Sequence, residues 1–442
     1  MRWLVYNLLF AVAYAAMLPQ FLLRMKRRGG YRNRFADRFG RYPADVEARL
    51  RDMTGAVWIH AVSVGEVYVA GQVMRALRER MPGVRFVLST TSSTGWKEAE
   101  KVVGPTDVLI FNPLDFPPCV KRAVAAIRPR AFILTESEIW PNVIRSCHGR
   151  GVPIFLVNAR VSDRSAPGYR RLRLWFGPVL RMFTAIQAQS ETDKQRLVAA
   201  GAEPDRVDVT GSFKFDVANR SPEKEQAVAA FLARHDAGRD RTVLLGGSTW
   251  PGEDAVLVGI YKRLQARFPA LRLVLVPRHF EKADAVQAGI EKAGLACVRK
   301  SRESEARGAG VDNEGGQATV ILGDTTGELM GFYGNADVVF VGKSLCEHGA
   351  QNMIEPCLCG AATLVGPYTE NFRPVMSDLL DAGALIQVPD AAALEREIER
   401  LVADAAARRT LGERAAAAVL KRRGVVARCA AAMAAKIPGA SA

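Results

Sequence analysis

One pattern of apolar and polar positions recurs along the whole chain. Short runs rich in valine, isoleucine and leucine are each followed by a stretch with apolar residues at helical spacing. Strands that alternate with helices in this way predict parallel sheets, and two series of about six strands favour two doubly wound α/β domains over one closed barrel. The predicted strands are 56–62, 84–90, 107–111, 131–135, 153–158, 184–189, 242–246, 272–276, 319–323, 337–341, 362–366 and 384–388.

The connecting segments suggest where the domains divide. Turn-forming residues gather near 204–222, which predicts a linker between the two series of strands. Residues 301–316 are polar and rich in glycine, so they predict a mobile surface loop. The alanine-rich stretch 390–436 predicts helix that ends in a disordered tail.

The amino-terminal segment predicts a membrane anchor. No charged residue occurs from Trp3 to Leu23, and a basic cluster at 24–28 follows. That length is about enough to cross a bilayer, although Asn7, Pro19 and Gln20 leave open a helix that lies in the interface. The basic flank predicts that the rest of the chain is cytoplasmic, and the lack of a small-x-small cleavage site before it predicts that the anchor is retained.

Composition and charge narrow the class of partner. The 442 residues are 49% hydrophobic and 24% charged, which suits two domains with full cores. Residues 1–200 hold 31 Lys and Arg against 15 Asp and Glu, whereas the remainder holds 30 against 31. This division predicts an anionic partner for the first half, either nucleic acid or anionic lipid. The basic amphipathic stretch 169–176 either touches lipid head groups or is an ordinary helix with a solvated basic face.

Several kinds of site have no sequence signal. The seven cysteines include no CxxC pair, which favours a reducing compartment, and the five histidines show no metal-ligand spacing. The chain also lacks a P-loop, a G-x-S-x-G nucleophile elbow and an H-E-x-x-H zinc motif. We therefore expect no metal centre.

The first candidate residue is Glu66. The strand 56–62 is followed by Gly65 and then by Glu66 in the first turn of a predicted helix. Open α/β sheets bind ligands at the carboxyl ends of their strands, and a helix amino terminus favours a charged carboxylate there. Glu66 therefore suits a general base, although an acid in this position can simply cap the helix.

Two further groups follow predicted strands or stand at the linker. Glu136 and Glu138 follow the strand 131–135, so one of them could face a ligand, or both could be a helix-start acid cluster. Lys214 lies between Phe213 and Phe215 in the linker, where it could meet an anion or simply cover packed rings.

The second half places polar, glycine-rich loops after several strands, as nucleotide-binding sheets do. Arg278 could pair with a phosphate, and the turn 323–329 could hold an anion on its backbone N–H groups. The segment 349–356, with an asparagine at a helix start and a glutamate one turn later, could bind phosphate and ribose. The loops 246–249 and 341–344 are further candidates. Each signal is weak alone, but together they favour a nucleotide site.

As a set, these motifs resemble the 3-deoxy-D-manno-octulosonic acid (Kdo) transferase family of lipopolysaccharide synthesis. The matching pieces occur in family order over residues 31–375, and the combination is highly specific. They are Tyr31-Arg32-Asn33-Arg34-Phe35, His60 to Glu66, Thr135 to Asn142, Asn158-Ala159-Arg160-Val161-Ser162, Gly211 to Asp216, Pro277-Arg278-His279, Gly327-Glu328-Leu329 and Asn352 to Glu355.

The resemblance implies an α/β architecture of the GT-B type, with two Rossmann-like domains facing a cleft. An N-terminal membrane anchor would occupy 1–28, an acceptor-binding domain 29–210, a CMP-sugar-binding domain 211–425 and a C-terminal tail 426–442. The basic first half would then meet the phosphates of a lipid acceptor.

The resemblance also implies an activity and a set of site residues. It implies an inverting, metal-independent transfer of Kdo from CMP-Kdo to a lipid A precursor, lipid IVA, on the cytoplasmic face of the inner membrane, with no cofactor and no nucleic-acid partner. Glu66 matches the general base, and Glu136 and Lys214 match groups that stabilise the transition state. The positions that match CMP-binding ones are Pro277, Arg278, Thr326, Gly327, Glu328, Asn352, Met353, Ile354 and Glu355.

The chain departs from the family pattern at three places. Gly349-Ala350-Gln351-Asn352 stands where Gly-Gly-His-Asn is common, Gly342-Lys343-Ser344 where Gly-Gly-Ser is common, and Asp37 where a glutamate is frequent. These changes affect details of the donor loop, and Lys343 could add a phosphate contact of its own.

Two other functions remain as alternatives. One is a GT-B glycosyltransferase that uses a nucleoside-diphosphate sugar on a lipid acceptor. The other is a membrane-attached protein that binds nucleic acid or lipid without catalysis, which the basic half allows but which gives Glu66, Glu136 and Lys214 no role.

Overall fold

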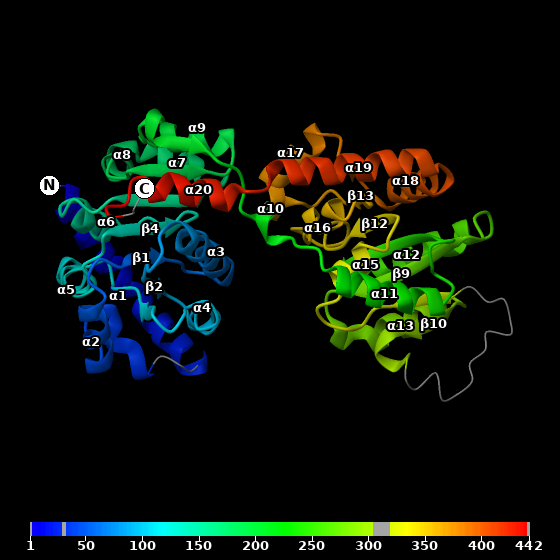
Figure 1. Ribbon diagram of the computed structural model, residues 1–442, viewed down its shortest axis with the longest axis horizontal. Helices are drawn as coiled ribbons and strands as arrows, with labels where there is room; N and C mark the ends of the chain where they lie inside the picture. The colour runs from blue at the N-terminus through cyan, green and yellow to red at the C-terminus, as the bar shows by residue number, and fades with distance from the viewer. Residues whose placement is uncertain (1, 29–31, 304–318, 440–442) are drawn as a thin grey trace. The chain divides into compact units, whose positions relative to one another are not determined.

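The computed structural model describes residues 2–28, 32–303 and 319–439, which form two compact α/β units (Figure 1). The first unit comprises Met1–Phe213 with Gly424–Ala442, and the second comprises Lys214–Arg423. Tyr31 of the first family motif lies outside the described residues, as does most of the predicted loop 301–316.

The first unit contains a seven-stranded parallel sheet in the order β3-β2-β1-β4-β5-β6-β7. The order reverses between β1 and β4, which is the point where doubly wound sheets place ligands. The strands are β1 Val57–His60, β2 Phe86–Thr90, β3 Val108–Phe111, β4 Ala131–Thr135, β5 Ile154–Ala159, β6 Ala185–Ala188 and β7 Val207–Val209.

Helices cover both faces of this sheet. They are α1 Arg2–Arg28, the 3₁₀ helix η1 Arg32–Phe39, α2 Ala44–Asp52, α3 Val64–Arg80, α4 Ser93–Ala99, α5 Pro117–Ile127, α6 Pro141–His148, α7 Ala166–Arg171, α8 Arg173–Leu180, α9 Glu191–Ala199, η2 Pro204–Arg206 and α20 Val425–Ala434.

The second unit repeats the same plan, with a parallel sheet in the order β10-β11-β9-β8-β12-β13-β14. Here the order reverses between β8 and β12. The strands are β8 Thr242–Thr249, β9 Leu271–Pro277, β10 Ala296–Arg299, β11 Thr319–Leu322, β12 Val338–Val341, β13 Ala362–Val365 and β14 Ile386–Gln387.

The helices of the second unit lie on both sides of its sheet. They are α10 Lys214–Val217, α11 Pro222–Arg234, α12 Glu253–Gln265, η3 Phe280–Lys282, α13 Ala283–Lys292, η4 Lys300–Arg302, α15 Leu329–Tyr333, α16 Ile354–Leu358, η5 Glu370–Phe372, α17 Arg373–Asp381, α18 Ala391–Ala403 and α19 Ala405–Arg422.

The central strands are buried on both faces, which explains their unbroken apolar runs. In β1, Trp58 joins the core on one face of the sheet, whereas Val57 and Ile59 join the core on the other, and all three are fully buried. The alternation follows from the two-residue repeat of a strand. All twelve predicted strands are present, so the prediction of two parallel sheets is confirmed.

The sequence missed two strands, β7 and β10, which lie at the edges of their sheets. Two of the three β7 residues are exposed, and all four β10 residues are only half-buried. A strand with one free edge and little burial carries no continuous apolar run, so its sequence signal is weak.

The chain passes from the first unit to the second between Phe213 and Lys214, inside the segment 204–222. Phe213 is buried in the core of the first unit and Phe215 in the core of the second. The two phenylalanines therefore fix the ends of the crossing in separate cores.

The predicted C-terminal tail 426–442 is helical over 426–434, within the stretch 390–436 that the sequence predicts as helix. Its first part belongs to α20, whose apolar residues recur at helical spacing and are buried in the core of the first unit beside α3 (Figure 1). The Gln187 amide also donates to the Cys429 carbonyl at 3.1 Å. The short alanine-rich helix buries little area per residue, so its composition concealed its role in the core.

The charge division of the sequence follows the two units. The first unit contains 34 Lys and Arg against 18 Asp and Glu, and the second contains 27 against 28. The basic excess therefore belongs to one folding unit and is not spread along the chain.

Candidate active site

Glu66 lies in the first turn of α3, at the carboxyl end of β1. Ser63 is the N-cap, and its hydroxyl oxygen accepts the Glu66 N–H at 3.3 Å while its O–H donates to Glu66 Oε1 at 2.9 Å. Ser63 therefore caps the helix, and Glu66 helps to fix this cap through the Ser63 hydroxyl, although a full capping box would use the Ser63 N–H. The structural explanation for this glutamate is thus correct in part. It does not exclude a chemical role, because the same bonds fix the carboxylate in one orientation.

The other carboxylate oxygen of Glu66 has two donors. Oε2 accepts the Val62 N–H at 3.1 Å and the Thr135 O–H at 3.0 Å. An ionised carboxylate can accept about four hydrogen bonds, and these three donors leave one position open. With the residue 8% exposed, Glu66 is held rigidly and still reaches solvent.

Glu136 follows β4 directly and has an unusual backbone. Its φ of 55° lies in the left-handed region, which is costly for a residue with a Cβ. The conformation is held by the bond from the Glu136 N–H to the Val157 carbonyl at 2.9 Å and by an ion pair of 3.0 Å between Arg160 Nε and Glu136 Oε2. The turn thus places Glu136 at the carboxyl end of β4, with its carboxylate paired to Arg160, which follows the neighbouring strand β5.

Glu138 is the third acid at this edge. Burial raises its pKa to about 7, and the charges of Glu66 and Glu136 add to the rise while a bond from Trp140 opposes it. The sequence marked Glu138 as part of an acid cluster without giving it a role. Its proximity to Glu66 depends on the turn after β4, which spacing alone does not show.

Lys214 begins α10 in the second unit. Its Nζ donates to the Asn371 carbonyl at 2.7 Å and lies 3.9 Å from the ring centre of Phe372. The lysine therefore contacts η5, far along the chain, and not only the phenylalanines that flank it in sequence. Its cation remains half-exposed.

Three of the nucleotide candidates converge at the ends of β9 and β12. Asn352 Nδ2 donates to Glu355 Oε1 at 3.0 Å, and Asn352 Oδ1 accepts the Ile354 N–H at 3.1 Å. Burial raises the pKa of Glu355, while the Asn352 bond and the positive charge of Arg278 oppose the rise. Arg278 is exposed at the end of β9, and its N–H is held by the Thr249 carbonyl at 3.0 Å.

Two members of the nucleotide set can contact a ligand only through their backbone. Met353 and Ile354 are fully buried, and both side chains pack in the core of the second unit. Their apolar character in the sequence therefore reflects packing beneath the loop. Pro277 ends β9, which β8 separates from β12 in the sheet, and is half-buried.

Thr326, Gly327 and Glu328 form the turn after β11. Lys300 Nζ lies 3.0 Å from Glu328 Oε1, and Lys224 Nζ donates to the Gly327 carbonyl at 2.8 Å. Burial would raise the pKa of Glu328, but bonds from Thr325 and Lys300 hold it below its ordinary value. This turn therefore presents a fixed carboxylate with two lysines next to it.

Two loops expected to approach a ligand are occupied by the protein itself. The segment 246–249 lies within β8, where a Cβ on Gly246 would come 2.6 Å from Leu257 and one on Gly247 2.5 Å from the Tyr333 hydroxyl. These glycines make room for packed side chains, so close packing explains them without a ligand.

The loop after β12 is closed in a similar way. Four backbone N–H groups donate to the fully buried carboxylate of Glu253, those of Trp250 and Lys343 at 2.8 Å and those of Ser344 and Leu345 at 3.0 Å. These groups are not available to a phosphate.

The departures from the family pattern in this region have a backbone explanation. Lys343 has a φ of 59° and Ala350 a φ of 57°, and both stand where glycine is common in the family. Glycine adopts this conformation without steric cost. The Lys343 cation lies 4.5 Å from the ring centre of Trp250. The structure thus gives Lys343 an intramolecular partner.

The site residues divide between the units. Glu66, Glu136 and Glu138 lie at the end of β1 and β4 in the first unit, whereas Lys214 and the whole nucleotide set belong to the second. No group of three or more histidine, cysteine or acidic side chains suited to a metal ion occurs in the part of the chain that the structure describes.

The sequence matches two known families. Residues 33–217 match the family described as 3-deoxy-D-manno-octulosonic-acid transferase (kdotransferase), and residues 303–418 match glycosyl transferases group 1. The chain is 38% identical to the 3-deoxy-D-manno-octulosonic acid transferase of Bordetella pertussis, covering 86% of this chain and 87% of that one. It is 32% identical to that of Haemophilus influenzae, covering 84% of each.

Solved structures with little sequence similarity share the fold. A glycosyltransferase from Rickettsia africae superposes with a TM-score of 0.56 at 14% identity, covering 88% of this chain and all of that one. UDP-GlcNAc 2-epimerase from Neisseria meningitidis superposes with a TM-score of 0.54 at 13% identity, covering 86% and all of that chain. The fold therefore serves more than one chemistry.

The two parallel-sheet units and the family matches make this protein a glycosyltransferase with the GT-B type of fold, as the sequence predicted. Within that class, the chain belongs to the 3-deoxy-D-manno-octulosonic acid transferase family, and it is an enzyme of Kdo transfer in lipopolysaccharide synthesis.

Proposed function

We propose that the protein transfers Kdo from CMP-Kdo to a phosphorylated lipid A precursor, lipid IVA, with inversion and without a metal. The observation that carries the mechanism is the carboxylate of Glu66, which three donors orient and which keeps one acceptor position free. That position suits the hydroxyl proton of an acceptor sugar.

In the proposed step, Glu66 takes the proton from the acceptor hydroxyl as its oxygen bonds to the anomeric carbon of Kdo. The bond from that carbon to the phosphate oxygen breaks, and CMP leaves with the electron pair. Negative charge develops on the phosphate and positive charge at the anomeric carbon. Lys214 is suited to stabilise the negative charge on the phosphate, and Glu136 is suited to stabilise the positive charge at the anomeric carbon.

The donor role of the second unit is supported by its charge arrangement. Arg278 offers an exposed guanidinium for a phosphate, and Asn352 and Glu355 form a bonded pair that offers both a donor and an acceptor for ribose. Lys224 and Lys300 lie beside the turn at Gly327 and Glu328, so this side of the site also carries positive charge.

The acceptor role of the first unit is supported by its basic character and by α1. The stretch Arg2–Gln20 is long and apolar enough to cross a membrane, which by itself is weak evidence because a signal sequence has the same properties. The helix is also docked on its own unit: Tyr6 donates to Asp115 at 2.7 Å, and Phe10 packs edge-on against Phe116 with ring centres 5.0 Å apart.

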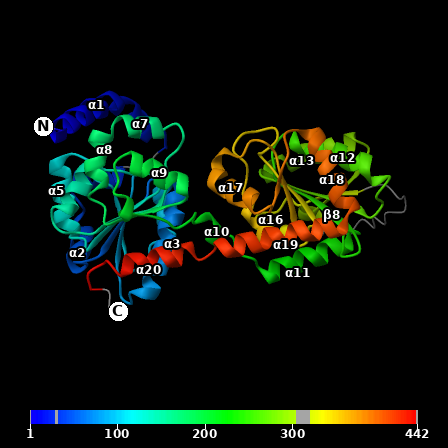
Figure 2. The same cartoon turned by 90° about the horizontal axis from the view of Figure 1, so that it is seen from above.

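The opposite side of α1 carries apolar side chains that nothing in the described structure covers. Leu4, Leu8, Leu9, Val12 and Met17 are each more than 60% exposed. Figure 2 shows α1 at the outer edge of the first unit. We propose that α1 lies in the membrane interface with this side in the lipid, so that the catalytic unit meets its acceptor at the surface. The basic cluster at 24–28 favours the cytoplasmic face, because the anionic lipids of that leaflet attract lysine and arginine.

The deciding experiment is to incubate the full-length protein with CMP-Kdo and lipid IVA and to measure the product masses. One or more Kdo additions are expected, and CMP should inhibit while UDP should not. Inhibition by UDP with no use of CMP-Kdo would favour a transferase of a nucleoside-diphosphate sugar. Glu66→Gln, which keeps the size of the side chain, should abolish transfer and leave CMP binding unchanged. Normal turnover in that variant would remove Glu66 from its role as the base.

A further inference from the structure

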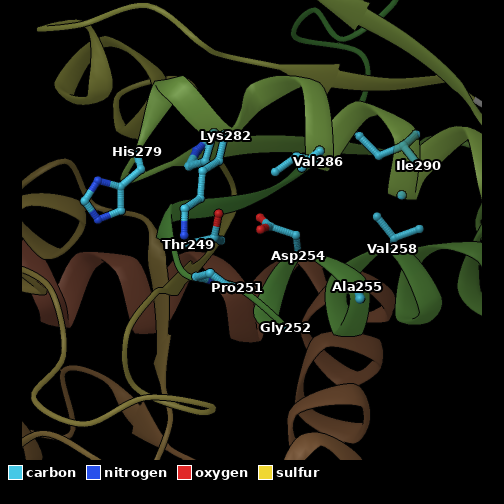
Figure 3. Close-up of a pocket in the computed structure, with 13 residues that line it drawn as sticks. Thr249, Pro251, Gly252, Asp254, Ala255, Val258, His279, Lys282, Val286 and Ile290 are labelled. Carbon is cyan, nitrogen blue, oxygen red and sulfur yellow. The ribbon is translucent and has the colours of Figure 1, made fainter.

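A cavity of about 250 Å³ opens in the second unit between α12 and α13, beside the residues assigned to the donor (Figure 3). One wall is formed by the end of β8 and the start of α12, and the other by residues 277–290. Its size lies below the roughly 300–1,000 Å³ of sites for drug-sized ligands, so it suits a smaller molecule than a nucleotide sugar.

Two oxygen atoms in this cavity are buried without a hydrogen-bond partner. They are Thr249 Oγ1 and Asp254 Oδ1. Thr249 is only 2% exposed. Burial raises the pKa of the Asp254 carboxyl to about 6; the Thr249 hydroxyl lowers it and the charge of Glu253 raises it. The Thr249 hydroxyl lies near enough to Asp254 to affect its pKa, but no well-formed hydrogen bond to either oxygen is present, and one hydroxyl proton cannot fill the acceptor positions of both. Because buried polar groups are normally paired, the two oxygens keep acceptor positions that a further donor could fill.

A positive charge faces the same space. In Figure 3, Lys282 extends from the opposite wall toward Thr249, and His279 lies at the rim. Neither Asp254 nor Lys282 forms an ion pair within the described part of the chain, although both line the cavity. The Asp254 carboxylate and the Lys282 ammonium thus line the same cavity without forming an ion pair with each other.

The far end of the cavity is apolar. Val258 and Ile290 are at most 5% exposed and, with Val286, line the end beyond Asp254 (Figure 3). The order along the cavity is therefore apolar end, two acceptor oxygens, then a cation at the mouth. A ligand that matches this order has an aliphatic group, a positively charged donor and an anion.

We propose that this cavity binds a small aliphatic α-amino acid. Its ammonium would donate to Asp254 and Thr249, its carboxylate would pair with Lys282, and its side chain would pack on Val258 and Ile290. Every polar group of the cavity is then satisfied by a group of opposite character, and the aliphatic side chain removes apolar surface from water.

The position of the cavity gives the bound amino acid an effect on the donor. The Thr249 carbonyl accepts the Arg278 N–H. The carboxylate of Glu253, the residue before Asp254, accepts the backbone N–H groups of the loop 343–345. Occupancy should therefore change the affinity for CMP. This effect rests on the proposed donor site, whereas binding of the amino acid itself does not.

The test is a calorimetric titration of the full-length protein in detergent with L-leucine. Binding is expected, and it should weaken about 10–100-fold in Asp254→Asn and measurably in Thr249→Val and Lys282→Gln. Lys292→Gln, at the exposed end of α13, is the matched control and should bind normally. Two leucine analogues, 4-methylpentanoate without the ammonium and 3-methylbutylamine without the carboxylate, should each bind more weakly.

Three outcomes would overturn the proposal. They are no heat of binding with L-leucine, binding that Asp254→Asn leaves unchanged, and competitive displacement of leucine by CMP that goes to completion, which, unlike a limited change in affinity, would place leucine in the donor site. Unfolding midpoints of the variants identify a loss that comes from misfolding, and Thr249→Val keeps the shape of the wall if Asp254→Asn fails to fold. None of these results changes whether Glu66→Gln abolishes Kdo transfer, so the two proposals fail separately.

Discussion

The hydroxyl of Thr135 donates to Oε2 of Glu66 at 3.0 Å, so the last residue of β4 holds a carboxylate that follows β1. The same hydroxyl shares its single proton with the carbonyl oxygen of His60, the last residue of β1, which is also 3.0 Å away. Thr135 therefore joins two adjacent strand ends at the point where the sheet order reverses. Its role is to position Glu66 and not to touch a substrate.

Replacing Thr135 by valine should lower kcat while leaving KM nearly unchanged. Valine keeps the branched shape but removes the donor, and a hydrogen bond to a charged group is worth about 1.5–3 kcal/mol. If that stabilisation acts in the transition state, kcat falls about 10- to 150-fold. Thr135→Ser restores the hydroxyl and should retain most activity. Steady-state kinetics of Thr135→Val and Thr135→Ser measure this effect. Equal kcat values in the two variants would show that the hydrogen bond from Thr135 to Glu66 does not contribute to catalysis.

Glu138 should make the protein less stable as the pH rises toward neutrality. Its pKa is raised from 4.5 to about 7, so the folded protein holds this proton more tightly than the unfolded chain does. The stabilisation is complete below pH 4.5 and is lost as the pH rises to about 7. Glu138→Gln stays neutral at every pH. At pH 8 its free energy of unfolding, measured by urea denaturation, should exceed that of the parent protein by up to about 3 kcal/mol.

The control for this prediction is the same comparison at a lower pH. At pH 4, below the ordinary pKa of 4.5, the free energies of unfolding of Glu138→Gln and the parent should nearly coincide. A gain for Glu138→Gln that is equal at both pH values would indicate a packing effect and not a titration.

The left-handed backbone at Lys343 predicts that glycine is better than alanine there. Both substitutions lose the contact of the cation with Trp250, so their difference isolates the backbone. With a φ of 59°, Lys343→Gly should be more stable than Lys343→Ala by about 1 kcal/mol. At Arg409, exposed inside α19, the order should reverse by about the same amount. Thermal unfolding of the four variants is the measurement, and the same order at both positions would contradict the explanation.

The sequence was sufficient for the fold because the central strands are buried on both sides. Strands such as β1 and β4 consist of fully buried residues, and their apolar runs are visible without any structure. The edge strands β7 and β10 gave no such signal. The helix α20 falls inside the predicted helical stretch 390–436, but its place in the first unit was missed. It follows the second unit in sequence and packs on the first, and spacing along a chain does not show which core a helix joins.

The candidate site could be predicted only in part for a related reason. Motifs placed Glu66 and Glu136 at strand ends, and topology alone brings such ends to one edge. The hydrogen bond from Thr135 and the raised pKa of Glu138 depend on side-chain directions after the turn, which no pattern contains. The glycines at 246 and 247 were misread because a close approach to Tyr333 looks in sequence like a close approach to a ligand.

The exposed side of α1 should determine how tightly the protein binds lipid. Leu8 and Val12 are 66% and 61% exposed, whereas Tyr6 on the docked side is bonded to Asp115. Leu8→Gln with Val12→Gln should weaken binding to vesicles of anionic phospholipid by tenfold or more, because each buried CH₂ contributes about 0.8 kcal/mol. Leu420→Gln removes a leucine that is 58% exposed in the second unit and should have no effect.

A vesicle flotation assay measures this binding. If α1 lies in the interface, it must also stay docked on the first unit for that unit to reach the lipid acceptor. Tyr6→Phe loses its bond to Asp115 but keeps its ring, so α1 should detach more readily from its unit while the exposed leucines stay intact. Lipid binding should then persist, but Kdo transfer to lipid IVA should fall, because the catalytic unit is no longer held at the surface. If the double variant on the exposed side floats with vesicles as well as the parent does, α1 does not present that side to the lipid.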